Sequence, residues 1–310
     1  MHRFLWLAST HARACLIIGL IAGLALPSFA ALLVPWLPMM VVALLTTTAL
    51  RIGYRAALGA VGDLGWGLAA VAMLQMMVPL ALLGLLTLAG LQNTTVALAI
   101  ILTSSAPAIT GSVNLALMLR LDGGRMMQIL VLGTAAFPLT VLPVLWLLPQ
   151  LGPPGDVILS ALKLLGVILF ATSIGFLLRH MFPKPTEGQI KALNGLSVLA
   201  FSFIVIALMA ALTPALLRNP WLVAQWAVLA FAIGYLMQLL TLLVLRRSRW
   251  RTVAGPLAIG AGNRNIAIFL VALPPDVLAP LMIFIGCWQL PMYLTPMLLP
   301  RLYAWALQDD

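Results

Sequence analysis

The sequence predicts an all-α integral membrane protein in which ten transmembrane helices form two inverted repeats of five. Of the 310 residues, 63% are hydrophobic and only 8% are charged, against roughly 25% charged residues in soluble domains. Apolar runs of membrane length recur along the whole chain, and interruptions of similar sequence recur in two of them. We therefore expect residues 1–310 to form a single polytopic domain.

Ten apolar stretches are long enough to cross a bilayer of about 30 Å as helices that rise about 1.5 Å per residue. They cover residues 14–33, 35–50, 64–90, 93–119, 124–149, 157–179, 190–213, 221–245, 253–274 and 278–300. The second stretch is short, and we expect its boundary with the first between Leu33 and Pro38.

Basic residues alternate between successive loops in the way that this topology requires. Most of the 17 Lys and Arg residues fall in the loops of one side, and the exceptions are Lys163, Arg218 and Arg264. By the positive-inside rule these loops and both termini are cytoplasmic, as in a multi-pass protein of a bacterial-type inner (plasma) membrane. The net charge of +10 therefore reflects topology, and no nucleic-acid partner is expected. Tryptophans near span ends, Trp288 among them, are interpreted as membrane-interface anchors.

Two motifs recur at nearly the same offset along the chain. The stretch from Gly111 to Leu117 is similar to the stretch from Gly262 to Ile268, and a pair of prolines follows each stretch in the next span. We infer two repeats, 14–149 and 157–300. Because each repeat holds an odd number of spans, the second is inverted relative to the first. Inverted repeats with broken helices in corresponding positions are typical of secondary transporters, whose site lies at the midplane where the breaks meet.

The ninth span carries the most unusual residues. Gly260, Gly262, Asn263, Arg264 and Asn265 interrupt an otherwise apolar segment. A helix break at membrane depth requires protein or a water-filled cavity around it, because lipid offers no hydrogen bonds to the backbone. A cation at that depth costs ~2.5–3.5 kcal/mol even on the insertion scale. This break is therefore predicted to be a functional site.

Three interpretations of Arg264 stay open. Its guanidinium could bind a carboxylate or sulfonate of a substrate in a bidentate manner. It could instead be a built-in cation that donates to carbonyls at the ends of the half-helices. It could also extend its stem to a membrane interface.

Other polar residues at the two breaks are candidates for substrate binding or for helix capping, for which Asn is well suited. The substrate-binding candidates, besides Arg264, are Asn263, Asn265, Thr110, Ser112 and Asn114. Gln75 and Gln128 can be ligands, although polar residues in membrane helices also serve as interhelical hydrogen-bond partners.

Three segments resemble the bile acid:sodium symporter family. They are Leu74-Gln-Met-Met-Val-Pro79 in the third span, Ser104-Ser-Ala-Pro-Ala-Ile-Thr-Gly-Ser112 in the fourth and Gly262-Asn-Arg-Asn265 in the ninth. The resemblance covers essentially all ten spans. It implies a panel domain and a core domain, with broken helices four and nine crossing near the membrane centre. It also implies alternating access that carries an organic anion, often together with sodium.

Sodium is the one cofactor that the resemblance implies. Gln75, Ser112, Gln128 and Thr134 are the candidate sodium ligands, whereas the family's Glu and Gln on the ninth span correspond to Ala258 and Gly262. Hard cations prefer several oxygen ligands, usually including a carboxylate, and no acidic residue lies deep in a predicted span. Sodium, protons or no ion at all therefore stay open as the driving ion.

We expect a secondary active transporter of a small organic anion of the bile-acid, pantoate, keto-acid or sulfonate class. One alternative is an arsenite or metalloid exporter of the same fold, although Ser105-Ala-Pro107 stands where the related carriers have Cys. Another alternative is a non-transporting membrane sensor. No enzymatic activity is expected, because no base, nucleophile or metal site is visible. The expected partners are the anion and the lipid bilayer, with no obligate protein partner.

Overall fold

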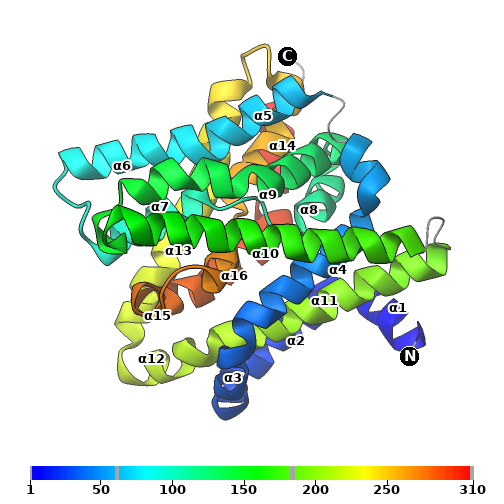
Figure 1. Ribbon diagram of the computed structural model, residues 1–310, viewed down its shortest axis with the longest axis horizontal. Helices are drawn as coiled ribbons and strands as arrows, with labels where there is room; N and C mark the ends of the chain where they lie inside the picture. Colours follow the sequence, from blue (N-terminus) through cyan, green and yellow to red (C-terminus); the bar gives the residue numbers. More distant parts are fainter. Residues whose placement is uncertain (1, 60–62, 182–185, 308–310) are drawn as a thin grey trace. The chain divides into compact units, whose positions relative to one another are not determined.

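The computed structural model describes residues 2–59, 63–181 and 186–307, and every regular element within these ranges is helical (Figure 1). The prediction of an all-α protein is therefore confirmed. Seven helices of the described residues are long and apolar enough to cross a membrane. They cover Pro27–Tyr54, Leu64–Leu88, Gly123–Trp146, Pro154–Met181, Glu187–Arg218, Pro220–Leu245 and Pro275–Leu298.

These seven helices fall on seven of the ten predicted spans. The other three predicted spans, 14–33, 93–119 and 253–274, are each divided by a break in the helix. The helix pair Arg3–Thr10 and Ala14–Ala25, bent by 91°, raises the number of spans to eight if it counts as one. A multi-pass membrane protein follows from these helices, whereas the ten-span inverted repeat stays a prediction.

The predicted boundary between the first two spans is wrong. Helix α2 (Ala12–Ala25) ends before Leu26, whose φ of −120° and ψ of 64° are not helical. The cause is Pro27, because a proline ring disfavours the helical conformation in the residue before it. Helix α3 (Pro27–Leu33) then passes through the 3₁₀ turn η1 (Val34–Trp36) into α4 (Leu37–Gly59). Pro35 and Pro38 thus lie at helix starts, where a missing N–H is tolerated.

The contacts divide the chain into two compact units, and each unit is assembled from three separate segments. The first unit comprises Met1–Leu58, Lys163–Trp226 and Ala267–Cys287, and the second comprises Gly59–Leu162, Ala227–Ile266 and Trp288–Asp310. Helices α10 (Pro154–Met181), α13 (Pro220–Leu245) and α16 (Met282–Leu298) contribute residues to both.

In the first unit, α11 (Glu187–Leu208) packs against α1 (His2–Thr10), α2 and α3. A Cβ on Gly195 of α11 would overlap the carbonyl of Leu5, so the backbones of α1 and α11 require glycine at their contact. The short elements η4 (Met209–Ala211), α12 (Leu212–Arg218), α15 (Pro275–Leu278) and η6 (Ala279–Leu281) complete this unit, together with most of η5 (Ile266–Val271).

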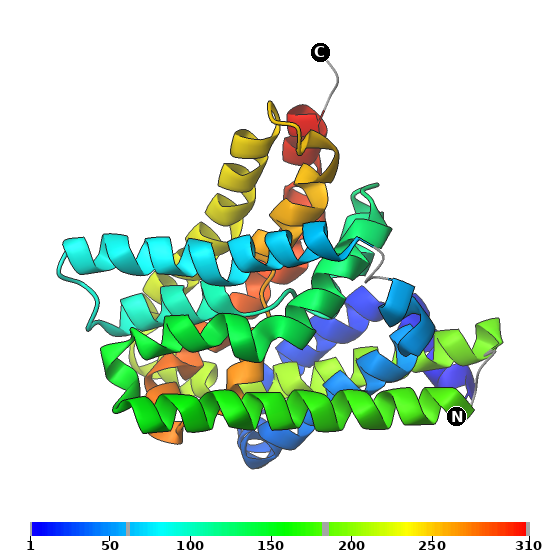
Figure 2. The same ribbon diagram turned by 45° about the horizontal axis from the view of Figure 1, so that its top comes forward.

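The second unit contains both of the breaks predicted from the sequence. Its helices are α5 (Leu64–Ala72), α6 (Val78–Leu88), α7 (Thr95–Ser105), α8 (Ser112–Met118), α9 (Gly123–Trp146), α14 (Arg251–Gly262) and α17 (Pro300–Leu307). A π-helical turn, η2 (Met73–Met77), joins α5 to α6, and the chain then reverses into α7 (Figures 1 and 2). Helix α9 packs against α5, α8 and α14.

Candidate functional site

Both breaks arise from local sequence. Helix α7 ends at Ser105, because Pro107 forces Ala106 into an extended conformation (φ −60°, ψ 151°). The chain becomes helical again at Ser112. Helix α14 ends at Gly262, and Asn263 leaves the helical region (φ −119°, ψ 83°) before the 3₁₀ segment that starts at Ile266.

The two unwound segments lie side by side and hydrogen-bond to each other. The N–H of Ile109 donates to the carbonyl of Asn263 (2.9 Å), and the N–H of Asn265 donates to the carbonyl of Pro107 (2.8 Å). Ala108 and Arg264 form an isolated antiparallel bridge between these bonds. Each break therefore satisfies part of the other's main chain, as a site remote from water demands.

The side chain of Arg264 joins both breaks to a third element. Its Nε donates to the carbonyl of Ala261 (2.9 Å) at the end of α14, and its Nη1 donates to the carbonyl of Ala106 (3.0 Å) at the end of α7. Its Nη2 donates to the carbonyl of Leu74 (2.9 Å) in η2. The residue is 2% exposed. The guanidinium thus ends on three main-chain carbonyls in the interior of its unit and does not extend to a surface.

The carbonyl of Leu74 is available because of the turn in which it lies. The N–H of Val78 donates to Met73, one residue further back than in an α-helix. Pro79, the residue that would continue this π pattern, has no N–H. The carbonyl of Leu74 therefore has no hydrogen-bond donor within its helix, and Nη2 of Arg264 donates to it instead.

The other two carbonyls belong to helix C-terminal ends. The last carbonyls of a helix lack intrahelical donors and carry the negative end of the helix dipole, so a cation is stabilised there. No carboxylate of the described residues lies within salt-bridge distance of Arg264. Main-chain dipoles therefore solvate the guanidinium, and its formal charge is not paired.

Asn263 belongs to a buried network of polar side chains. The hydroxyl of Thr295 lies 3.2 Å from Asn263 Oδ1 and accepts from Gln238 Nε2 (3.4 Å), while Tyr303 donates to Gln238 Oε1 (2.8 Å). All four residues are buried. We did not single out Thr295, Gln238 or Tyr303 from the sequence, because isolated polar residues on three different helices carry no shared spacing.

Replacing Thr295 with valine is expected to lower the thermal unfolding midpoint of the purified protein. Valine keeps the shape of threonine but removes the hydroxyl, which leaves the buried Asn263 Oδ1 without its hydrogen bond at a cost of ~1–3 kcal/mol, whereas Gln238 Nε2 keeps its bond to the carbonyl of Gly234 (3.0 Å). Thr172→Val is the matched control, because the Thr172 hydroxyl bonds only to carbonyls of its own helix, the nearer at 2.6 Å. Equal midpoints for the two variants would contradict a structural role of the network.

Trp288 has a different role from the one predicted from the sequence. Its indole N–H donates to the carbonyl of Arg264 (2.9 Å), and the side chain is fully buried. The interpretation of Trp288 as an interface anchor is therefore wrong. A tryptophan in an apolar helix satisfies its N–H either at an interface or at a buried acceptor, and the unwound backbone at Arg264 provides that acceptor.

The remaining substrate-binding candidates differ in how deeply they are buried. Ser112 is fully buried at the start of α8, and its hydroxyl has no hydrogen-bond partner among the described residues. Thr110 and Asn265 are half-buried in the unwound segments. Asn114 is exposed on α8, so the structure does not bring it to Arg264. One helical turn separates residues three or four apart, and Asn114 is only two residues from Ser112, on another face.

The predicted sodium ligands do not come together in one hydrogen-bonded cluster. Gln75 accepts from Thr140 (3.0 Å), whereas Gln128 accepts from Arg125 (3.0 Å) and donates to the carbonyl of Asp63 (2.9 Å). Thr134 is half-buried on α9. Within the described residues, no three His, Cys, Asp or Glu side chains are grouped so that they could hold a metal ion.

Gln128 belongs to a cluster at the start of α9. Arg125 forms a salt bridge with Asp63 (2.8 Å), and this hydrogen bond holds the pKa of the Asp63 carboxyl below its usual value. The backbone N–H of Arg125 donates to Asp122, the N-cap of α9. Gln128 is therefore engaged in joining the start of α9 to the start of α5.

No family model matches this chain, and a search of curated proteins finds no match to it.

Proposed function

We propose that the protein is a secondary active transporter of a small organic anion, and that it works by alternating access about the two paired breaks. The seven apolar helices of membrane length support a membrane location. Both breaks belong to one compact unit. Paired breaks of this kind are the usual substrate site in secondary transporters.

The observation that carries the proposal is the antiparallel pairing of residues 107–109 with 263–265 around the buried Arg264. Unwound backbone at membrane depth is costly and is found where it contacts a ligand or lines a path. Arg264 supplies positive charge at that place. A guanidinium has five N–H donors, and three of them bond to carbonyls.

The class of substrate follows from charge. Carbonyls replace the water around Arg264 but carry no net charge, so the guanidinium still attracts an anion. In an interior of low dielectric this attraction acts over several ångströms, and the anion need not touch the guanidinium. The buried, unpartnered hydroxyl of Ser112 is a second group that a substrate oxygen can contact. We infer a carboxylate or sulfonate substrate.

We further propose that the chain has the fold of the bile acid:sodium symporters, with Arg264 as a permanent cation in place of a coupling sodium ion. Three carbonyls at 2.9–3.0 Å around one guanidinium provide oxygen ligands of the type that a hard cation uses. Because the cation is covalently attached, it cannot cross the membrane with the substrate. The transport cycle is then independent of sodium.

Sodium is accordingly expected to have no specific effect on the stability of the purified protein. A ligand that binds only the folded state stabilises it by ~2.7 kcal/mol at a hundredfold excess over its Kd. The measurement compares thermal unfolding midpoints in sodium chloride and in potassium chloride of equal ionic strength. A higher midpoint in sodium would show that the folded protein has a sodium site and would overturn the permanent-cation hypothesis.

Transport itself is tested with purified protein in proteoliposomes free of sodium. Counterflow of four labelled compounds is measured: a bile acid, pantoate, a keto acid and an alkyl sulfonate. At least one is expected to exchange faster than in protein-free vesicles. Exchange of none of the four, together with exchange of arsenite, would replace the proposal by metalloid export. Exchange of no compound at all would contradict a transporter of these classes.

A further inference from the structure

Arginines and tryptophans gather on one surface of the second unit, away from Arg264. This basic surface consists of Trp66, Arg120, Arg125, Arg249, Trp250 and Arg251. It is hollowed by three pockets of about 290, 440 and 260 Å³. Arg120 lines the first two pockets and Thr252 lines the first and third, so the three pockets are neighbours.

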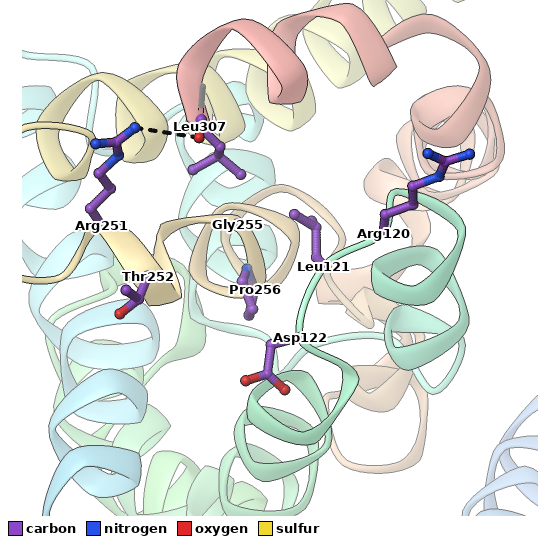
Figure 3. Close-up of a pocket in the computed structure, with 8 residues that line it drawn as sticks. All are labelled: Arg120, Leu121, Asp122, Arg251, Thr252, Gly255, Pro256 and Leu307. Carbon is purple, nitrogen blue, oxygen red and sulfur yellow. Dashed lines mark hydrogen bonds between the residues drawn. The ribbon is translucent and has the colours of Figure 1, made fainter. Parts of the chain in front are cut away.

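The first pocket lies between the connection from α8 to α9 and the start of α14. Arg120 and Arg251 lie on opposite sides of it; Figure 3 shows that the guanidinium of Arg251 points toward Leu307, whereas that of Arg120 extends away from the other lining residues. Arg251 donates to the carbonyl of Leu307 (3.4 Å), which fixes that side chain at the rim. Asp122 is the single acidic residue in this lining, and it already caps α9.

Arg120 has a backbone conformation that arginine rarely adopts. Its φ is +58°, and it is the only non-glycine residue with positive φ among the described residues. The N–H of Arg120 donates to Leu117 and the N–H of Leu121 donates to Ala116, which together form a Schellman cap at the end of α8. Glycine is the usual residue at this position, because a Cβ is strained there. An arginine at such a position indicates that its side chain has a use.

The second part of the surface pairs arginines with tryptophan rings. Trp66 and Trp250 stack with ring centroids 6.4 Å apart, Arg125 lies 4.6 Å from the centroid of Trp66, and Arg249 lies 5.8 Å from that of Trp250. Tryptophan rings favour the headgroup level of a membrane. Stacking on a ring holds a guanidinium in place. Nη1 of Arg125 bonds to Asp63 and Gln128, so its other N–H groups are the ones that can contact an anion.

We propose that the basic surface binds the phosphate group of an anionic phospholipid. Among the described residues, this surface holds four arginines and two carboxylates, those of Asp63 and Asp122, so positive charge is in excess there. Basic pockets between membrane helices recognise anionic headgroups, and arginine forks match phosphate geometry. The loop from Arg246 to Arg251 that supplies two of the arginines directly follows α13, a helix long and apolar enough to cross a membrane. A lipid phosphate is therefore favoured over free phosphate.

The test measures the thermal unfolding midpoint of detergent-purified protein during titration with phosphatidylglycerol, phosphatidylcholine or inorganic phosphate. Phosphatidylglycerol is expected to raise the midpoint at lower concentration than the other two. Arg120→Gly and Arg249→Gln are each expected to weaken the apparent affinity about fivefold, the effect of one arginine near an anionic surface. Without lipid, Arg120→Gly is expected to be at least as stable as the parent, because glycine relieves the strained cap.

The matched control is Arg218→Gln, which removes one exposed charge at the end of α12 in the other unit. It is expected to leave the affinity for phosphatidylglycerol unchanged. If Arg218→Gln weakened the affinity for phosphatidylglycerol as much as the other two variants, binding would depend on net charge alone, and the proposal would be overturned. Equal stabilisation by inorganic phosphate would assign the surface to a soluble anion. If Arg120→Gly gained stability and kept full affinity for phosphatidylglycerol, Arg120 would have no role in binding the lipid phosphate.

Discussion

Arg264→Ala is expected to abolish transport and to lower the thermal unfolding midpoint by a large amount. The substitution leaves the buried carbonyls of Ala261, Ala106 and Leu74 without the donors that they have now. Each stranded buried carbonyl costs ~1–3 kcal/mol. The loss falls on the ends of both half-helices and on η2, so the three elements that meet at the breaks would separate. The measurements are unfolding of the purified variant and anion counterflow in proteoliposomes.

Two further variants separate charge from geometry. Arg264→Lys keeps the charge, but a single ammonium cannot reach three carbonyls that a planar fork spans, so partial stability and slow transport are expected. Arg264→Met keeps much of the length without the charge, and its loss of transport is expected to match that of alanine. Unimpaired transport by the methionine variant would show that the positive charge has no role in the cycle.

Chemical rescue provides a sharper test of the permanent-cation hypothesis. Arg264→Ala opens a space between three carbonyls, and methylguanidinium at low millimolar concentration has the shape and donors to occupy it. We expect methylguanidinium to restore part of the unfolding midpoint of Arg264→Ala and to leave the parent protein unchanged. Sodium is the second arm of this experiment, because the same three oxygens could accept an ion. If neither cation stabilises the variant, the space does not function as a cation site.

The breaks could be predicted from sequence because their causes are local. Pro107 ends α7, and Gly262 with Asn263 ends α14. The sequence also indicated that Arg264 is at the centre of the site. It could not identify the partners of Arg264, since a main-chain carbonyl is the same group in every residue. Of the three carbonyls, only that of Leu74 could be suspected from the sequence, because Pro79 leaves it without a donor in its own helix.

Errors of prediction came from choosing among similar local signals. Pro27, Pro35 and Pro38 all lie at the start of a helical element, but only the residue before Pro27 leaves the helical region. Leu26 has φ −120° and ψ 64°, whereas Val34 and Leu37 keep helical angles before their prolines. Ser112 and Asn114 were both candidates from the sequence, and only the orientation of α8 shows that Ser112 is buried and Asn114 exposed. Tertiary packing also buries Trp288, which an apolar sequence context alone does not distinguish from an interface residue.

Gly262→Ala is expected to have the second largest effect on stability. A Cβ on Gly262 would overlap the carbonyl oxygen of Gly234 and would meet Gln238, whose Nε2 lies 2.8 Å away. The Gln238 side chain can rotate, but the backbone of α13 cannot yield without moving the whole helix. Overpacking of this kind typically costs ~1–3 kcal/mol. The shift would also disturb Asn263, because Gln238 and Thr295 belong to the network that holds it.

The control for this substitution is Gly84→Ala on α6, where no atom lies within 4 Å of the added Cβ. There alanine is expected to keep or raise the unfolding midpoint, because alanine stabilises a helix by up to about 1 kcal/mol relative to glycine. Gly262→Ala combined with Gln238→Ala separates the two contacts of the added methyl. The reference for the double variant is Gln238→Ala alone, because that substitution also removes the bonds to Tyr303 and Thr295. If Gly262→Ala lowers the midpoint no further in that background, the side chain of Gln238 was the obstacle. If it lowers the midpoint further, the carbonyl of Gly234 is the obstacle, and glycine at 262 is what allows α13 and α14 to approach closely enough to support the break at Asn263.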